Sequence, residues 1–101
     1  MVMKGEDIAK LEDIPNIGPA LASDLRIAGI GKPDDLKGND GYGLYAKLCA
    51  KTGKRHDPCV IDAFLAAVDF MNGAERRLWW RYTPERKKEL MRNPGRIVRG
   101  K

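Results

Sequence analysis

The sequence predicts an all-α domain, a compact bundle of about five helices, and three observations support this prediction. Apolar residues recur at helical spacing through most of the chain, prolines or small polar residues precede these segments, and glycines follow them. No segment shows the alternation of apolar and polar residues that is typical of a strand. A chain of 101 residues, of which 43% are hydrophobic, has room for one modest core. We therefore expect a single domain over residues 1–92, followed by a disordered basic tail over residues 93–101.

The N-terminal third predicts two helices joined by a tight turn. A first helix over residues 5–13 ends before Pro15, which disfavours the helical region for the residue preceding it. Gly18 can adopt the positive φ that a tight turn needs, and Pro19 suits the first position of the next helix. This second helix runs over residues 19–28, and the glycine that follows suits the position beyond a helix C-terminus.

This segment resembles the helix-hairpin-helix motif, whose turn and second-helix N-terminus point backbone N–H groups at a nucleic-acid phosphate. The resemblance implies contacts from Asn16, Ile17, Gly18 and Ala20. A helix N-terminus can bind an anion, because its first N–H groups are unpaired and the helix dipole is positive there. The motif usually has glycine where this chain has Asn16, and often a basic residue where it has Ala20. Residues 1–31 carry 3 basic and 5 acidic side chains, whereas phosphate binding normally relies on neighbouring cations. The alternative is therefore a hairpin with a purely structural role.

Three further helices and one short turn are expected along the rest of the chain. Residues 32–36 form the short helical turn. A helix capped by Asn39 or Asp40 follows and ends at Gly53.

The two remaining helices begin with proline. Asp57 caps the first of them, Pro58 is its first residue, and Gly73 ends it. Its apolar face is wide enough for the central helix of the core. This face consists of Val60, Ile61, Phe64, Leu65, Val68 and Met71. Thr83 and Pro84 open the last helix by the same logic, and it extends to the end of the domain.

Positive charge is concentrated in the last quarter of the chain. Residues 1–74 hold 9 Lys and Arg against 11 Asp and Glu, whereas residues 75–101 hold 10 against 3. This asymmetry indicates a basic surface that can follow a phosphate backbone, with a merely solvated helix face as the alternative. The candidate residues are Arg76, Arg77, Arg81, Arg86, Lys87, Lys88 and Arg92.

Aromatic residues are interleaved with these arginines. Trp79, Trp80 and Tyr82 alternate with basic positions, as in surfaces on which single-stranded nucleic acid stacks. The alternative is that the segment folds back over the core, and we expect at least one tryptophan to do so.

Several segments together resemble the small bacterial pathogenicity-locus family, some of whose members are labelled mitomycin-resistance proteins. The resemblance covers about residues 8–90. The segments that carry it are Leu48–Gly53, Arg55–Val60, Ala67–Phe70, Trp79–Trp80 and Thr83–Lys87. It implies a helix-hairpin-helix fold and a link to DNA or its damage, without implying a reaction.

Cys49, His56 and Cys59 form a third candidate site. With Asp57 they offer four ligands of the types that zinc binds, although their spacing matches no common zinc pattern. Cys59 also stands in the first turn of a helix beside His56, and both features favour a reactive thiolate. The alternative, which we predict, is that both cysteines are reduced, buried and structural and that His56 forms a hydrogen bond in its loop. We therefore expect no metal and no cofactor.

The chain lacks a recognisable catalytic constellation. It contains one histidine and no nucleophile elbow, phosphate-binding loop or dinucleotide fingerprint. It has no apolar run long enough to cross a membrane and no initial signal segment, so we expect a cytoplasmic protein. Our leading hypothesis is a non-enzymatic nucleic-acid-binding accessory module that contacts the backbone of DNA. The alternatives are a protein-interaction module in which the hairpin is a scaffold and the tryptophans dock a partner, and the thiol or metal protein described above.

Overall fold

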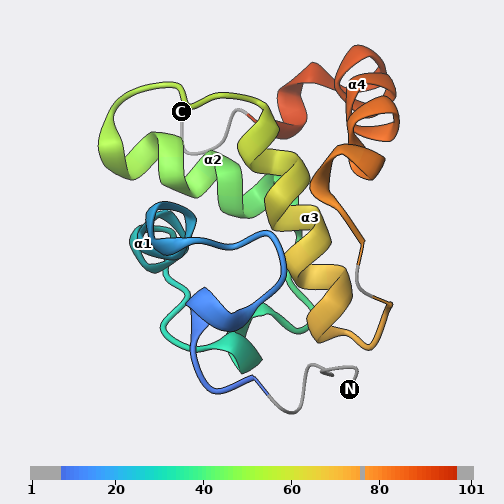
Figure 1. The fold of residues 1–101 in the computed structure, drawn as a ribbon. Coiled ribbons are helices and arrows are strands. Elements are labelled where there is room, and N and C mark those ends of the chain that lie inside the picture. The colour runs from blue at the N-terminus through green and yellow to red at the C-terminus, as the bar shows by residue number, and fades with distance from the viewer. Residues whose placement is uncertain (1–7, 76, 98–101) are drawn as a thin grey trace.

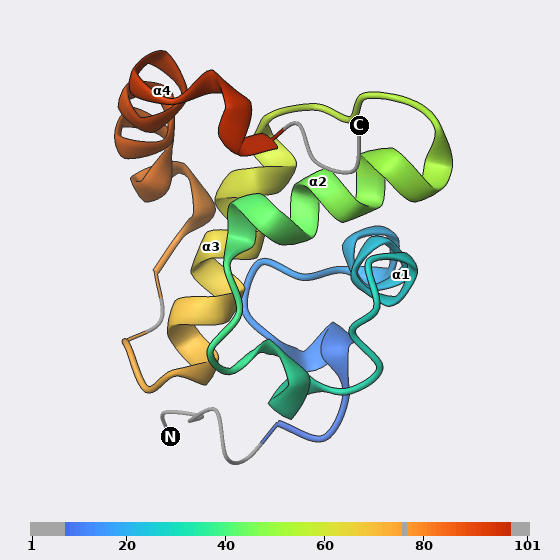
Figure 2. The ribbon, with the colours of Figure 1, turned by 180° about the vertical axis from the view of Figure 1, so that it is seen from behind.

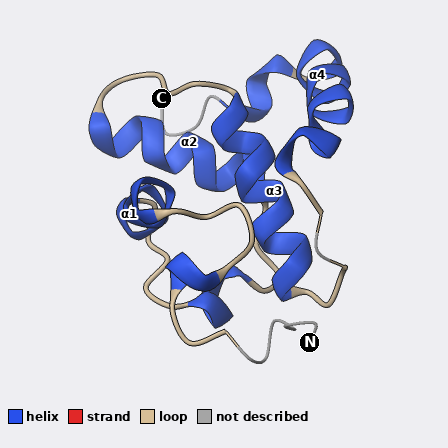
Figure 3. Ribbon diagram, in the orientation of Figure 1, coloured by secondary structure: helices blue, strands red, loops and turns tan. Residues whose placement is uncertain are grey.

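Helices and short helical turns make up the regular structure of this protein. The computed structural model describes residues 8–75 and 77–97, and no strand occurs in these ranges (Figures 1 and 3). The α-helices are α1 (Pro19–Ile27), α2 (Gly41–Thr52), α3 (Cys59–Met71) and α4 (Thr83–Arg92). The 3₁₀ turns are η2 (Leu11–Asp13), η3 (Pro33–Leu36), η4 (Trp79–Tyr82) and η5 (Pro94–Ile97). The all-α prediction is confirmed, with four α-helices in place of about five.

Helix α3 is the centre of the molecule. Helix α2 crosses it, and α1 and α4 lie on opposite sides of this pair, as the two views show (Figures 1 and 2). The predicted apolar face of α3 is in the core, where Ile61 and Phe64 are completely buried. The crossing with α2 is close, because a Cβ added at Gly41 would lie 2.8 Å from the Cδ2 atom of Leu65. A glycine is therefore needed where the two central helices meet.

The first predicted helix is wrong in the part that the structure describes. Only η2 is helical there, residues 8–10 are not, and residues 5–7 lie outside the described ranges. Leu11 and Ile14 are both buried and stand three residues apart. This spacing suits a 3₁₀ turn, which has three residues per turn, and such a turn brings both side chains to the core.

The predicted helix ends are mostly confirmed. The Asp40 side chain accepts a hydrogen bond from the Tyr42 N–H at the start of α2, and Gly53 ends this helix with φ +72°. Asp57 accepts a hydrogen bond of 2.8 Å from the Cys59 N–H, which lowers the pKa of this carboxyl group. Pro58, however, lies just before α3 instead of opening it.

The C-terminal part of the fold differs from the prediction at two places. Thr83 does not cap α4: it is the first residue of the helix, and its hydroxyl group donates a hydrogen bond of 2.6 Å to Asp62. In place of a disordered tail from residue 93, η5 packs back on the domain. Arg96 forms ion pairs with Asp40 at 3.2 Å and Glu89 at 2.7 Å. Residues 98–101 lie outside the described ranges. Within those ranges, no helix has the length and apolar character needed to cross a membrane.

Candidate nucleic-acid interface

The turn before α1 takes its shape from Asn16. This residue has φ +72°, the one positive φ at a non-glycine position among the residues that the structure describes. Gly18, for which the sequence predicts a positive φ, has φ −89° and ψ −175° instead. Asparagine tolerates the left-handed region better than most residues, so the unusual backbone conformation stands two positions earlier than expected.

The N-terminus of α1 presents backbone donors to solvent. Gly18 is the N-cap residue and has no side chain to pair with them, and the first intrahelical bond runs from the Ala22 N–H to the Gly18 carbonyl. In the described part of the chain, the N–H groups of Gly18, Ala20 and Leu21 have no hydrogen-bond partner. Gly18 and Ala20 are exposed. Three free donors at the positive end of a helix dipole are suited to an anion.

Ile17 has a different role from its neighbours. Its side chain is only 3% exposed, and its N–H group is bonded to the Ile14 carbonyl at 3.0 Å. It therefore anchors the turn in the core and offers nothing to a ligand.

The side-chain amide of Asn16 joins this turn to the C-terminal part of the chain. Its Nδ2 atom donates a hydrogen bond of 2.6 Å to the Arg77 carbonyl, and its Oδ1 atom accepts one of 3.3 Å from the Trp79 N–H. These contacts span more than sixty residues of sequence. The turn before α1 and the segment of residues 77–81, called here the basic segment, are therefore neighbours.

The basic residues of the C-terminal part are not equally available. Arg77, Arg81, Lys87 and Lys88 are exposed and take part in none of the ion pairs found in the described ranges. Arg92 is exposed but lies 3.7 Å from Glu89. Arg76 lies outside the described residues.

Arg86 differs from its predicted role. Its side chain is only 9% exposed, and its Nε atom lies 2.9 Å from Oδ1 of the buried Asp62. A second hydrogen bond of 3.1 Å joins the same two side chains, and this pairing raises the pKa of Arg86. Arg86 therefore fastens α4 to α3 and presents no charge at the surface.

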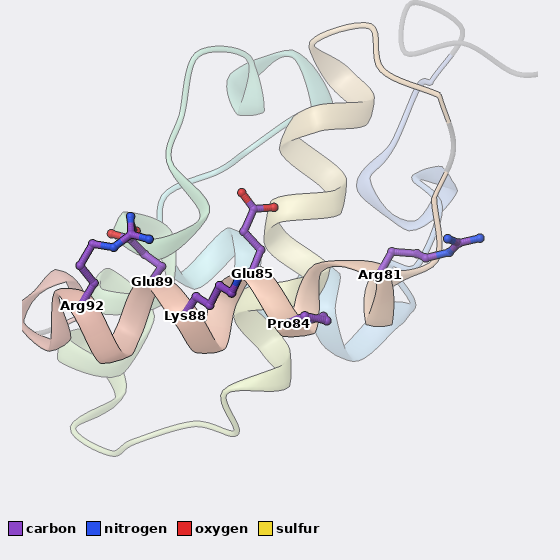
Figure 4. Close-up of a pocket in the computed structure, with 6 residues that line it drawn as sticks. All are labelled: Arg81, Pro84, Glu85, Lys88, Glu89 and Arg92. Atoms are coloured by element: carbon purple, nitrogen blue, oxygen red, sulfur yellow. Dashed lines mark ion pairs between the residues drawn. The ribbon is translucent and has the colours of Figure 1, made fainter.

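The outer face of α4 is hollowed. Figure 4 shows Arg81 before the N-terminus of the helix and Arg92 at its C-terminal end, with Lys88 between them. Together with Pro84, Glu85 and Glu89 they line a shallow hollow of about 470 Å³. Glu85 and Glu89 offset part of the positive charge of Arg81, Lys88 and Arg92 on this face. The positive charge is therefore less offset toward the basic segment than along α4.

The two tryptophans differ in exposure. Trp79 packs against the core, which confirms that at least one tryptophan is part of it. Trp80 is 52% exposed and meets Trp79 edge-on, with ring centroids 5.8 Å apart and an interplanar angle of 83°. Leu78 beside them is 47% exposed. The basic segment thus carries apolar as well as charged surface.

Two aspartates that the sequence analysis did not single out hold this surface in place. Asp62 binds Arg86 and Thr83, and Asp69 accepts a hydrogen bond of 2.9 Å from the Tyr82 hydroxyl. Burial and this bond to Asp69 raise the pKa of Tyr82. The signal in the sequence is a pair of acidic residues seven apart on an otherwise apolar helix, which places both near one side of it.

Cys49, His56 and Cys59 do not form a common site. No three His, Cys, Asp or Glu side chains gather to hold a metal in the part of the chain that was searched. His56 is hydrogen-bonded to Thr52 at 2.8 Å, as predicted, but Cys59 is exposed, contrary to the prediction that both cysteines are buried. Desolvation and the neighbouring Asp57 raise the pKa of the Cys59 thiol, which argues against a reactive thiolate.

Comparison with known proteins identifies the family. The chain matches the family described as Pathogenicity locus over residues 4–88. It belongs to this family. The mitomycin resistance protein McrB of Streptomyces lavendulae is 38% identical to it over 88 residues, which are 87% of this chain and 84% of that protein. The resemblance expected from the sequence is therefore confirmed. No solved structure matches the chain.

The match to the Pathogenicity locus family includes both parts of the candidate interface. The turn before α1 and the basic segment lie within residues 4–88, as do Asp62 and Asp69. Arg92 and η5 lie beyond this range.

Proposed function

We propose that this protein is a non-enzymatic accessory module that binds the sugar–phosphate backbone of DNA. The observation that carries the proposal is the pair of hydrogen bonds between the Asn16 side-chain amide and the backbone of Arg77 and Trp79. These bonds join the turn that leads into α1, two residues before the first free N–H donor, to the backbone of a segment that carries the exposed Arg77 and Arg81. We interpret the turn and α1 as a helix-hairpin-helix element whose first arm is the short turn η2.

The two parts of this surface complement each other. A helix N-terminus carries only about half a unit of positive charge, and residues 1–31 have more acidic than basic side chains. The α1 terminus therefore has little attraction for a polyanion over a long distance. Arg77 and Arg81, on the segment that Asn16 joins to this turn, supply full charges. Backbone contacts of this kind carry no sequence information.

The name of the relative supports DNA as the partner. McrB is described as a mitomycin resistance protein, and mitomycin acts on DNA. A module that binds the DNA backbone is consistent with a role in the response to DNA damage.

Substitutions at Gly18 test the proposal without disturbing the fold. Its φ and ψ are accessible to any residue, a Cβ added there meets no atom within 4 Å, and it occupies the N-cap position. Asp and Asn are both favoured N-cap residues, so Gly18→Asp and Gly18→Asn should be at least as stable as the parent. Asp alone places a negative charge at the proposed phosphate site. Two unit charges about 4 Å apart in water interact by about 1 kcal/mol, so we expect roughly fivefold weaker DNA binding.

The measurement is fluorescence anisotropy with a short labelled duplex over a series of salt concentrations. The account requires that both variants bind more weakly than the parent, because either side chain can accept a hydrogen bond from the Ala20 or Leu21 N–H. It also requires that Gly18→Asp binds more weakly than Gly18→Asn, because Asp alone adds a negative charge. If a folded Gly18→Asp variant retains full affinity, the N-terminus of α1 is not a contact site.

A protein partner is the second candidate, because Leu78 and Trp80 expose apolar surface. In this case the turn before α1 is a scaffold and the basic segment docks the partner. The absence of DNA binding at low salt would favour this candidate.

A further inference from the structure

Trp80 is supported by Trp79 although half of its surface is exposed. Trp80 lies in η4, and its ring forms an edge-on contact with the ring of Trp79 at an interplanar angle of 83°. Trp79 in turn packs against the core. The backbone N–H of Trp79 is fixed in turn by Asn16. A large aromatic side chain in such a supported and solvent-exposed position is a preformed contact surface.

The residues next to Trp80 in the chain, Leu78 and Arg81, line a hollow with cationic walls. Arg77, Leu78 and Arg81, together with Glu75, line a hollow of about 580 Å³. Arg81 also lines the hollow on α4 that contains Lys88 (Figure 4). The two hollows share Arg81, so cationic side chains follow one another from the basic segment onto α4.

We propose that Trp80 stacks on an unpaired base of single-stranded DNA while Arg77, Arg81 and Lys88 contact the flanking phosphates. This inference rests on the proposed function and names the form of DNA that is preferred. Bases within a duplex are stacked on each other, whereas each unpaired base offers an aromatic face. A groove that alternates aromatic and basic side chains is the usual design of a single-strand site.

Charge favours nucleic acid over a protein at this surface. Residues 75–101 hold 10 Lys and Arg against 3 acidic residues, and Arg77 and Arg81 form no ion pair within the described ranges. A polyanion neutralises such a path along its whole length, with release of counterions.

The experiment compares a single-stranded oligonucleotide with a duplex of the same length at the same salt concentration. The full chain is used as the parent, Trp80→Ala, Trp80→Leu and Trp80→Phe. We expect Trp80→Ala and Trp80→Leu to lose about tenfold in single-strand affinity, and Trp80→Phe to lose less, because it keeps an aromatic face. Duplex affinity should change by less than about twofold, because base stacking is not used there.

Met91→Ala is the matched control, because Met91 is 86% exposed and lies on α4. It should leave both affinities unchanged. Trp80→Leu keeps an apolar side chain, so it preserves the test if truncation to alanine disturbs η4.

The possible failures are distinguishable. If the parent binds DNA and the two non-aromatic variants bind the single strand as well as the parent does, stacking is refuted while backbone binding stands. If the parent binds neither form at low salt, both proposals fail and a protein partner becomes the better explanation. Stacking would also be refuted if replacement of Arg77 and Arg81 abolished single-strand binding while replacement of Trp80 did not.

Discussion

At the scale of single residues, Asn16 meets two requirements that few residue types meet together. It adopts φ +72°, and its amide group pairs with both a carbonyl and an N–H group of the basic segment. Glycine would satisfy the first requirement and not the second. The structure thus gives a reason for asparagine at this position, where glycine would adopt the same backbone conformation.

Asn16→Gly isolates the contribution of the amide group. Glycine adopts the same φ without strain, and the substitution removes two hydrogen bonds, each of which contributes about 1 kcal/mol. We expect the free energy of unfolding in urea to fall by about 1–2 kcal/mol, and tryptophan emission to shift to longer wavelength as Trp79 becomes more exposed. Unchanged stability together with unchanged emission would show that the contact does not hold the segment.

At the scale of elements, α3 holds the C-terminal part of the molecule through its two aspartates. Asp62 is completely buried and fastens α4, and Asp69 fastens η4 through Tyr82. The basic segment lies at η4, between these attachments and the turn before α1. Its position is therefore set by two side chains of α3 and by Asn16 of the turn before α1.

Removal of Asp62 tests the attachment of α4. Asp62→Ala leaves the guanidinium of Arg86 buried without its partner, and breaking a buried ion pair in this way costs about 3–5 kcal/mol. The double variant Asp62→Leu with Arg86→Met should recover most of this loss, because apolar residues of similar size can replace such a pair. Chemical unfolding of all three proteins measures both effects. A loss below about 1 kcal/mol in the single variant would contradict a structural role for the pair.

The elements also show which features can be predicted from the sequence. Helix ends such as Asp40 and Gly53 were predicted because the signal is local: a cap or a positive φ needs only a few neighbouring residues. The role of Arg86 could not be predicted, because its partner Asp62 is 24 residues away in the sequence. The sequence alone does not show which basic side chains are buried. The joining of the turn to the basic segment depends on an even more distant contact of Asn16.

At the scale of the whole molecule, the three tyrosines report on the integrity of the fold at high pH. Burial raises the pKa of Tyr42, Tyr45 and Tyr82, to about 12 for Tyr45. Tyrosine in an unfolded chain has a pKa of about 10. Below this pH both states are protonated, but between about pH 10 and 12 the unfolded chain loses protons first, so stability falls as pH rises. The contribution of the tyrosines to stability should therefore be constant up to about pH 9 and then decrease.

Parallel measurement of tyrosinate absorbance and helical circular dichroism checks this expectation. Ionisation should be delayed beyond pH 10 and should coincide with the loss of helix. Ionisation of all three tyrosines with ordinary pKa values, in a protein that stays helical, would contradict the buried positions described here.

The whole-molecule charge distribution predicts the salt dependence of DNA binding. Since Arg86 is buried and Arg92 lies near Glu89, the cations of residues 77–92 that remain available are Arg77, Arg81, Lys87 and Lys88. Each phosphate contact contributes about 0.7–0.9 to the slope of log affinity against log salt concentration. Replacement of these four residues by glutamine should therefore flatten the slope by about three units when all four contact phosphate.

The control for this variant is an equal change of charge elsewhere. Four exposed cations of α2 and the loop after it are available: Lys47, Lys51, Lys54 and Arg55. Their replacement by glutamine should change the slope by much less. Equal effects of the two variants would show that binding follows net charge and has no defined surface.

The central claim is that the N-terminus of α1 and the basic segment form one surface for DNA. Titration of the ¹⁵N-labelled protein with a short DNA oligonucleotide, followed by two-dimensional NMR, tests this claim most directly. The account predicts that the largest shifts occur together, at the amides of Gly18, Ala20 and Leu21 and at the indole N–H of Trp80. Shifts confined to α2 and its following loop, with the α1 terminus unaffected, would contradict it.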